Sequence, residues 1–297
     1  MLKRKRLIVM VLMLVLVMAG TCLAEADSNF LWQVEEVDSD VYLMGSFHLL
    51  PEGYYPLEDT IETAFEESEF LAVEVNVLDV DQAEVEAIEY ETGFYSGDEK
   101  LSDNIDEELF QKAKEKVEIL GVTEAVLDQL KPWYVGLLIG QLQLYELDFT
   151  PEQGVETYFL NKAAEQEKEI LELESIEEQL YMLSGLSSEV QIASLEAELE
   201  EIEEFDGQEL NEMVEAWSAG DKERLEDLMF SVREENPELE EYYETVFDQR
   251  DVVLTDKIED FIAEGKDIFV VVGAGHLANE RGILTLLEER GYQLKQL

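Results

Sequence analysis

The sequence predicts an α/β fold, in which strands from the N- and C-terminal parts of the chain form a single central β-sheet with a large helical insertion between them. Three observations favour it. Short apolar runs rich in β-branched residues occur near both ends of the 297-residue chain, and a glycine ends the run over residues 268–273. Between them, apolar residues recur at steps of three to four, which is typical of helices. Apolar residues make up 46% of the chain, enough for a core, and we expect one domain over residues 27–297.

Residues 1–26 are expected to be a signal peptide. Four cations at positions 3–6 precede an apolar run over 7–19, and small residues follow at Ala24 and Ala26. This is the order of regions in a secretory leader. An uncleaved N-terminal anchor is the alternative, although the apolar run is short for a bilayer span. In either case we expect an extracytoplasmic protein, secreted or attached to the cell envelope.

Cys22 is the only cysteine, and it falls within this expected leader. The mature chain would therefore have no internal disulfide and no thiol nucleophile. Lipid attachment at Cys22 stays open as a further alternative, although Thr21 directly before it fits such a site poorly. A membrane is thus expected as a partner only through the N-terminal segment, if that segment is uncleaved or lipidated.

The chain is strongly acidic. It has 72 acidic and 20 basic residues, which gives a formal net charge of −52. Nucleic acid is excluded as a partner, because binding phosphates requires a basic patch. We interpret the acidic residues as a solvated surface suited to a salty or alkaline habitat, at the cost of self-repulsion at low salt.

The expected elements begin with a hairpin. Residues 30–36 and 41–47 are predicted to be strands because a short polar stretch separates them. Residues 133–147 are apolar nearly all round, which favours a buried helix that another helix approaches closely at Gly136 and Gly140. The other elements are expected as a helix over 58–68, a strand over 70–76, helices over 79–149, a helix that starts at Thr150 and Pro151 and runs through 154–156, a strand over 169–174, helices over 176–264, the strand over 268–273, a helix over 279–290 and a strand over 292–297.

The only two histidines occupy equivalent positions. His48 ends the segment Gly45-Ser46-Phe47-His48, and His276 ends the segment Gly273-Ala274-Gly275-His276. Each histidine follows a predicted strand, and open α/β sheets hold their ligands at the carboxyl ends of strands. We expect the glycines to let the backbone turn tightly and present both imidazoles at that edge.

Glu74 is a carboxylate among valines in the predicted strand over 70–76. Such a group is costly in an apolar strand unless it is paired, protonated or bound to a metal. We expect Glu74 to point into the same crevice as the histidines, with a solvated face of the sheet as the alternative.

His48, Glu74 and His276 together have the side chains of a two-His-one-Glu metal site. A divalent ion would lower the pKa of bound water toward about 7 and polarise a carbonyl group, so hydrolysis would need no serine or cysteine nucleophile. The spacing alone leaves a purely structural role open for all three residues.

Several short motifs resemble the TraB/GumN family, in chain order from about Trp32 to Leu297. The motifs are His48-Leu49-Leu50-Pro51-Glu52-Gly53, Ala72-Val73-Glu74-Val75-Asn76, Lys131-Pro132-Trp133, Gly154-Val155-Glu156, Leu173-Glu174-Ser175 and Gly273-Ala274-Gly275-His276-Leu277. That family is related to the Tiki-type metalloproteases, which use two Gly-x-x-His motifs and a glutamate with a divalent metal. The resemblance implies that His48, Glu74 and His276 are the metal ligands and catalytic residues. The identity of the ion, among manganese, cobalt and zinc, stays open.

Other positions of the chain match the family's motifs less closely or leave their role open. Glu156 and Glu174 stand at motif positions and could orient the histidines, but a solvated glutamate is the simpler interpretation in so acidic a chain. Arg250 resembles the arginine of an Arg-Asn pair, yet Asp251 replaces the asparagine. Asn279 stands where a glycine is usual. These departures leave the three expected ligands intact and affect the expected substrate contacts.

The function expected from these features is that of a secreted metal-dependent hydrolase acting on peptides. A peptide or a small molecule is the expected partner. One alternative is a non-catalytic extracytoplasmic protein of the same fold that binds a ligand or modulates a signal. Another is a haem- or ligand-binding role, with one histidine as an axial ligand. The sequence predicts no oligomeric state.

Overall fold

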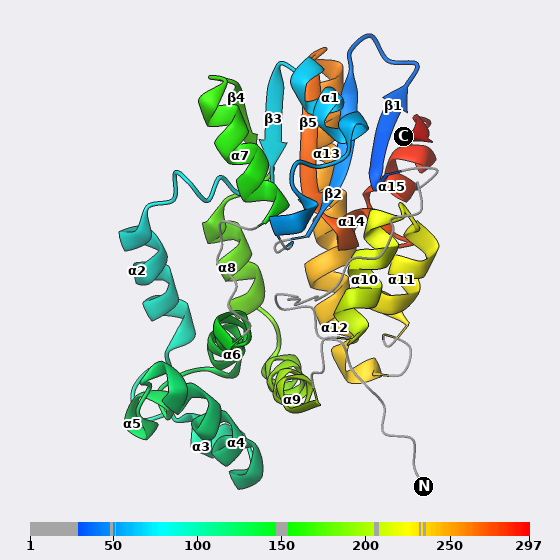
Figure 1. The fold of residues 1–297 in the computed structure, drawn as a ribbon. Helices are drawn as coiled ribbons and strands as arrows, with labels where there is room; N and C mark the ends of the chain where they lie inside the picture. The colour runs from blue at the N-terminus through cyan, green and yellow to red at the C-terminus, as the bar shows by residue number, and fades with distance from the viewer. Residues whose placement is uncertain are drawn as a thin grey trace, which may run out of the picture.

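The computed structural model describes residues 29–47, 50, 52–146, 154–204, 208–231, 233 and 236–297. Within them, one sheet is built from β1 (Leu31–Glu35), β2 (Val41–Ser46), β3 (Phe70–Val73), β4 (Glu169–Glu172), β5 (Ile268–Gly273) and β6 (Gln293–Gln296). The strand order is β4-β3-β5-β2-β1-β6, so C-terminal β5 lies between N-terminal β2 and β3, and C-terminal β6 lies beside β1. Figure 1 shows this sheet at the top of the molecule and a group of helices below it. The predicted α/β class, with a large helical part, is confirmed.

The central strands run parallel. β5 lies between β2 and β3 and is parallel to both, and β3 is also parallel to β4. Ser46 pairs with Gly273, and Val73 pairs with both Val271 and Glu172. The carboxyl ends of these four strands therefore lie along one edge of the sheet. The predicted hairpin of β1 and β2 is present, and β6 adds to β1 in antiparallel orientation.

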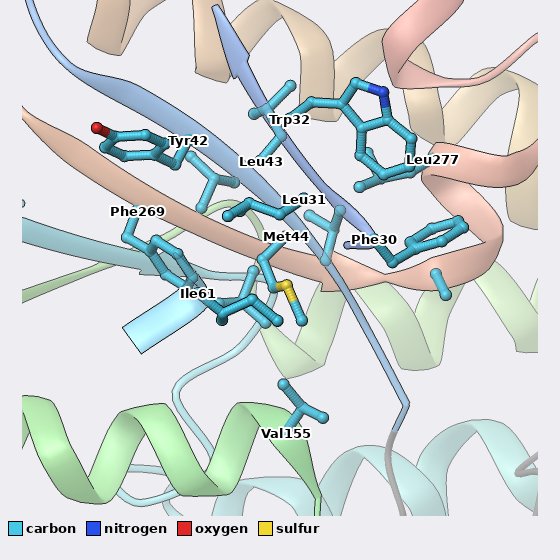
Figure 2. Packing of buried hydrophobic residues seen from close by; sticks show 14 of the residues in the cluster. Phe30, Leu31, Trp32, Tyr42, Leu43, Met44, Ile61, Val155, Phe269 and Leu277 are labelled. Atoms are coloured by element: carbon cyan, nitrogen blue, oxygen red, sulfur yellow. The ribbon is translucent and has the colours of Figure 1, made fainter. Parts of the chain in front are cut away.

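Both faces of the central strands are covered. The first five residues of β5 are buried, as expected of a parallel strand packed on two sides. Figure 2 shows Met44, Ile61 and Phe269 packed together on one side of the strands, and Trp32 beside Leu277 on the other. On the first side, α1 (Asp59–Glu67) and α7 (Val155–Glu165) lie in front of the sheet in Figure 1. This packing fixes the edge of the sheet from which the functional side chains project.

The helices between the strands follow the predicted periodicity. They are α2 (Gln82–Gly93), α3 (Leu101–Asn104), α4 (Glu107–Val117), α5 (Glu124–Leu127), α6 (Pro132–Glu146), α8 (Ile176–Ser184), α9 (Ser188–Glu204), α10 (Gln208–Ser218), α11 (Lys222–Phe230), α12 (Glu240–Tyr243) and α13 (Arg250–Ala263). The predicted close approach at Gly136 is confirmed, because a Cβ atom there would lie 2.3 Å from the Glu198 carboxylate of α9. Below the sheet, Val135 and Ile139 of α6 share a separate core cluster with Leu195 of α9.

Three predictions about the strand ends need correction. β3 ends at Val73, so Glu74 lies just beyond the strand and not within it. β4 likewise ends at Glu172, two residues before the predicted end. His276 does not follow a tight turn: Gly273 has a φ of −51°, and the chain passes directly into α14 (Ala274–Ala278), which contains the histidine.

The last predicted helix, expected over 279–290, is α15 (Ile283–Glu289). It begins later than expected because α14 ends at Ala278 and the chain must turn before the next helix. Gly282 permits that turn, since a Cβ atom at this position would lie 2.3 Å from the carbonyl oxygen of His276.

Two expectations concern residues that are not described. The leader, with Cys22, falls within residues 1–28, and His48 also lies outside the described residues. Among the helices that are described, none is long and apolar enough to cross a membrane.

Candidate active site

Two glutamates and one histidine project from the carboxyl edge of the sheet. Glu74 follows β3, Glu174 follows β4, and His276 follows β5 in the first turn of α14. Their exposed fractions are only 9%, 8% and 4%, so these polar groups are buried together. The backbone N–H of Glu174 donates to the carbonyl oxygen of Glu74 over 3.0 Å, which extends the pairing of β3 and β4 beyond the strand ends. The solvated interpretations of Glu74 and Glu174 are therefore wrong.

Glu74 is fixed against the end of β5. Its Oε1 accepts a hydrogen bond from the backbone N–H of Gly273 over 2.6 Å. The same oxygen lies 3.8 Å from Nε2 of His276. The strand ends thus bring together two of the three residues that the sequence predicted to form a site, although 202 positions separate them in the chain.

Asp251 orients the His276 ring through Nδ1, the nitrogen that does not face Glu74. Nδ1 lies 2.5 Å from Oδ1 of Asp251, whose side chain has no exposed surface. Asn279 donates from Nδ2 to Oδ2 of the same carboxylate over 3.2 Å. Burial raises the pKa of Asp251, while His276 and Asn279 act in the opposite direction. Both oxygens of this buried carboxylate therefore accept hydrogen bonds, one from His276 and the other from Asn279.

Arg250 is the cation of the site. Its Nη1 lies 3.0 Å from Nε2 of His276, its Nε lies 3.0 Å from each carboxylate oxygen of Glu174, and its Nη2 donates to both Glu74 and Glu174. Burial opposes the charge on Arg250, but the two carboxylates outweigh it and raise the pKa of the guanidinium. Because a guanidinium can only donate, Nε2 of His276 accepts, and the ring proton lies on Nδ1 toward Asp251.

A π-helix positions Arg250 and Asp251. It spans Glu244–Gln249 and runs directly into α13 at Arg250. A π-helix inserts extra residues into a turn and rotates the side chains that follow it, which is common near functional sites. Here the residues after it present consecutive side chains to Glu74 and to His276. No periodic pattern in the sequence marks a π-helix, so this part of the site was not predictable from spacing.

Residues at the start of α7 form hydrogen bonds with the end of β2 and the residue that follows it. The backbone N–H of Val155 donates to the carbonyl oxygen of Phe47 over 3.1 Å, one residue before His48. Ser46 donates from its hydroxyl to the carboxylate of Glu156. Tyr55 stacks on Tyr158 with ring centroids 4.7 Å apart, and burial, with the nearby Glu156 carboxylate, raises the pKa of Tyr55. Glu156 is thus a hydrogen-bond acceptor for the Gly-x-x-His segment and not simply a solvated glutamate.

The described residues supply two of the three expected metal ligands. Two atoms that each lie about 2.0–2.2 Å from one ion can be up to about 4 Å apart, so the 3.8 Å between His276 Nε2 and Glu74 Oε1 fits a shared ion. Asp251 orients the imidazole in the manner common for metal-binding histidines. Among the described residues there is no group of three His, Cys, Asp or Glu side chains arranged to hold an ion, and His48 lies outside them.

The fold and these motifs agree with one family. The model of the TraB/PrgY/gumN family matches residues 30–296, nearly the whole described chain. This chain belongs to the TraB/PrgY/gumN family.

Two curated proteins are similar to part of the chain. The chain is 25% identical over 147 residues to the uncharacterized protein YbaP of Escherichia coli strain K12, and equally to YbaP of Shigella flexneri. The match covers 49% of this TraB/PrgY/gumN protein and 52% of YbaP, so it spans about half the length of these curated relatives. No solved structure matches the chain.

Proposed function

We propose that this TraB/PrgY/gumN protein is a metal-dependent hydrolase whose centre is formed by Glu74 and His276 together with His48. The observation that supports it most is the 3.8 Å approach of Glu74 Oε1 to His276 Nε2 at the carboxyl edge of the sheet. The imidazole offers Nε2 because Asp251 takes Nδ1. A peptide is the preferred substrate class, and a small molecule with a hydrolysable carbonyl group is the other.

The chain's own residues have separate roles. His48, Glu74 and His276 would hold a divalent ion of manganese, cobalt or zinc, which when bound supplies an activated water and polarises the substrate carbonyl. Asp251 and Asn279 keep the imidazole in one orientation and one tautomer. The extracytoplasmic location expected from the leader remains part of the proposal.

Cleavage of a peptide library tests the proposal. We expect hydrolysis by the wild type that stops with a chelator and returns with manganese, cobalt or zinc. His276→Ala and Glu74→Gln should be inactive while circular dichroism stays unchanged. Glu280→Gln is the matched control, because its carboxylate just after α14 is 73% exposed and should not affect turnover. Hydrolysis that is insensitive to the chelator, or that survives in both site variants, would contradict the proposal.

A binding protein without catalysis is the second candidate. It is favoured by Arg250, which donates to Glu74 and to Glu174 and lies against His276 Nε2, so the polar groups at this edge already satisfy one another. A folded wild type that retains manganese but cleaves no member of the library would support this candidate. For the haem alternative, a Soret band in the purified protein is the decisive sign.

A further inference from the structure

We propose that Arg250 is an internal cation that occupies the ion position of this site and must withdraw toward Glu174 before a divalent ion binds Glu74 and His276. The inference rests on the proposed function, since it requires that these two residues hold an ion. It makes Arg250 a regulatory residue, because the guanidinium competes with the ion for Glu74 and His276 and so sets how tightly the ion binds.

The contacts of Arg250 use the atoms that an ion needs. Nη1 lies 3.0 Å from Nε2 of His276, and Nη2 donates to Oε2 of Glu74. The imidazole nitrogen has a single lone pair, so it cannot accept from Arg250 and bind an ion at the same time. Ion binding at His276 therefore breaks the contact with Nη1.

Charge makes the exclusion stronger. The side chains of Arg250 and Glu74 are each only 12% exposed, so water screens them poorly. A guanidinium and a divalent ion that share this pocket would repel each other at close range, and such repulsion grows as the surrounding dielectric falls. The arginine and the ion therefore alternate at the position between Glu74 and His276.

Glu174 provides the second place for the guanidinium. Its two carboxylate oxygens each lie 3.0 Å from Nε of Arg250, the nitrogen nearest the backbone. Gln179 donates to Oε1 of the same carboxylate over 2.6 Å and holds it in place. Arg250 can thus rotate its outer nitrogens away from His276 and keep its ion pair with Glu174.

Arg250 also stabilises the folded protein before an ion binds. Without a cation, Glu74 and Glu174 would be two buried carboxylates beside each other, and an uncompensated buried charge is strongly destabilising. Arg250 supplies the compensation, so the chain folds before the ion arrives. The cost is weaker ion binding, because the ion must first displace the arginine.

Calorimetric titration with manganese tests the inference. We compare the wild type with Arg250→Gln and with Arg281→Gln, which removes the same charge from an arginine that is 54% exposed and paired with Asp248. Arg250→Gln should bind manganese about tenfold more tightly or better, a gain of about 1.4 kcal/mol or more, while Arg281→Gln matches the wild type. The thermal midpoint of Arg250→Gln without metal should fall, and manganese should restore it.

Arg250→Lys covers the case in which the glutamine variant does not fold. Lysine keeps one cation but cannot reach Glu74, Glu174 and His276 together, so it competes less with the ion. The Arg250→Lys variant should therefore bind manganese more tightly than the wild type. If the wild type binds the ion and the Arg250 variants bind it equally or less tightly, the inference is overturned and the proposed function stands. An equal gain in Arg281→Gln would also overturn it. If folded wild type and variants all fail to bind, the metal site itself is wrong.

Discussion

The buried carboxylate of Asp251 accepts a hydrogen bond from Nδ1 of His276, with 2.5 Å between Oδ1 and the ring nitrogen. This contact joins the start of α13 to α14, and it decides which ring nitrogen faces Glu74. A hydrogen-bond acceptor at Nδ1 keeps the proton there and leaves Nε2 as a base or ligand.

Asp251→Asn should weaken metal binding. His276 and Asn279 use different oxygens of Asp251, and the substitution turns one of them into an NH2 group that cannot accept, so one contact is lost or the imidazole turns. We expect affinity for manganese to fall about ten- to hundredfold, as is usual when the carboxylate behind a metal-binding histidine is removed. Asp256→Asn on the same helix is the control, because its carboxylate is 63% exposed. Equal affinities for the two variants would mean that Asp251 does not position the histidine.

The two glycines that open the Gly-x-x-His segments should differ in their tolerance of alanine. A Cβ atom at Gly45 would lie 2.3 Å from the ring of Phe30, which is buried and cannot move aside, so Gly45→Ala should cost about 1–3 kcal/mol of unfolding free energy. At Gly273 the nearest atoms are 3.4 Å away, in ordinary contact, and the expected change is below about 1 kcal/mol. Urea denaturation of both variants measures the difference. Similar losses would show that the motif imposes the same backbone constraint twice.

The ion pair between Arg233 and Asp248 should weaken in acid. Burial alone would raise the pKa of Asp248, but hydrogen bonds from Arg233 and Asn279 hold it below its ordinary value of 3.8. Because the folded pKa is the lower one, the pairing stabilises the protein above about pH 4, and this stabilisation is lost as the pH falls further. Arg233→Gln should therefore be less stable than the wild type at pH 6, with a smaller difference at pH 3. A difference that stays constant with pH would show that the pair contributes nothing.

Salt should stabilise the chain as a whole. Repulsion within an excess of 52 negative charges is screened as the Debye length falls from about 10 Å at 0.1 M salt to about 3 Å at 1 M. We expect the thermal midpoint to rise over this range of sodium chloride, beyond any rise in sucrose of equal osmolality. The same midpoint in both solutes would mean that the acidic surface is not an important source of instability.

Local pattern predicted much of the fold. The β-branched run of β5 and the polar break between β1 and β2 correspond to the observed strands, because burial on both faces and a hairpin leave direct marks in the sequence. The strand ends were less accurate. Val75 continues the apolar pattern past Val73, but the pairing of β3 with β5 stops at Val73. Which residues remain hydrogen-bonded depends on the neighbouring strand, and a single strand does not reveal this.

The spatial arrangement of the candidate site was predicted in part. Glu74 and His276 do meet at the carboxyl edge, as the rule for parallel strands implies. The roles of Glu174, Arg250 and Asp251 were missed. A π-helix positions Arg250 and Asp251, and pairing that continues beyond β3 and β4 places Glu174 beside Glu74. In a chain with so many glutamates, composition favours a solvated carboxylate, and only the three-dimensional contacts identify the buried ones.

Anomalous diffraction from crystals grown with manganese tests the metal centre most directly. We expect one strong peak within about 2.0–2.2 Å of Nε2 of His276 and of a Glu74 oxygen, with the guanidinium of Arg250 moved toward Glu174. A peak at another place, or none here while Arg250 still contacts His276 in protein saturated with manganese, would contradict it.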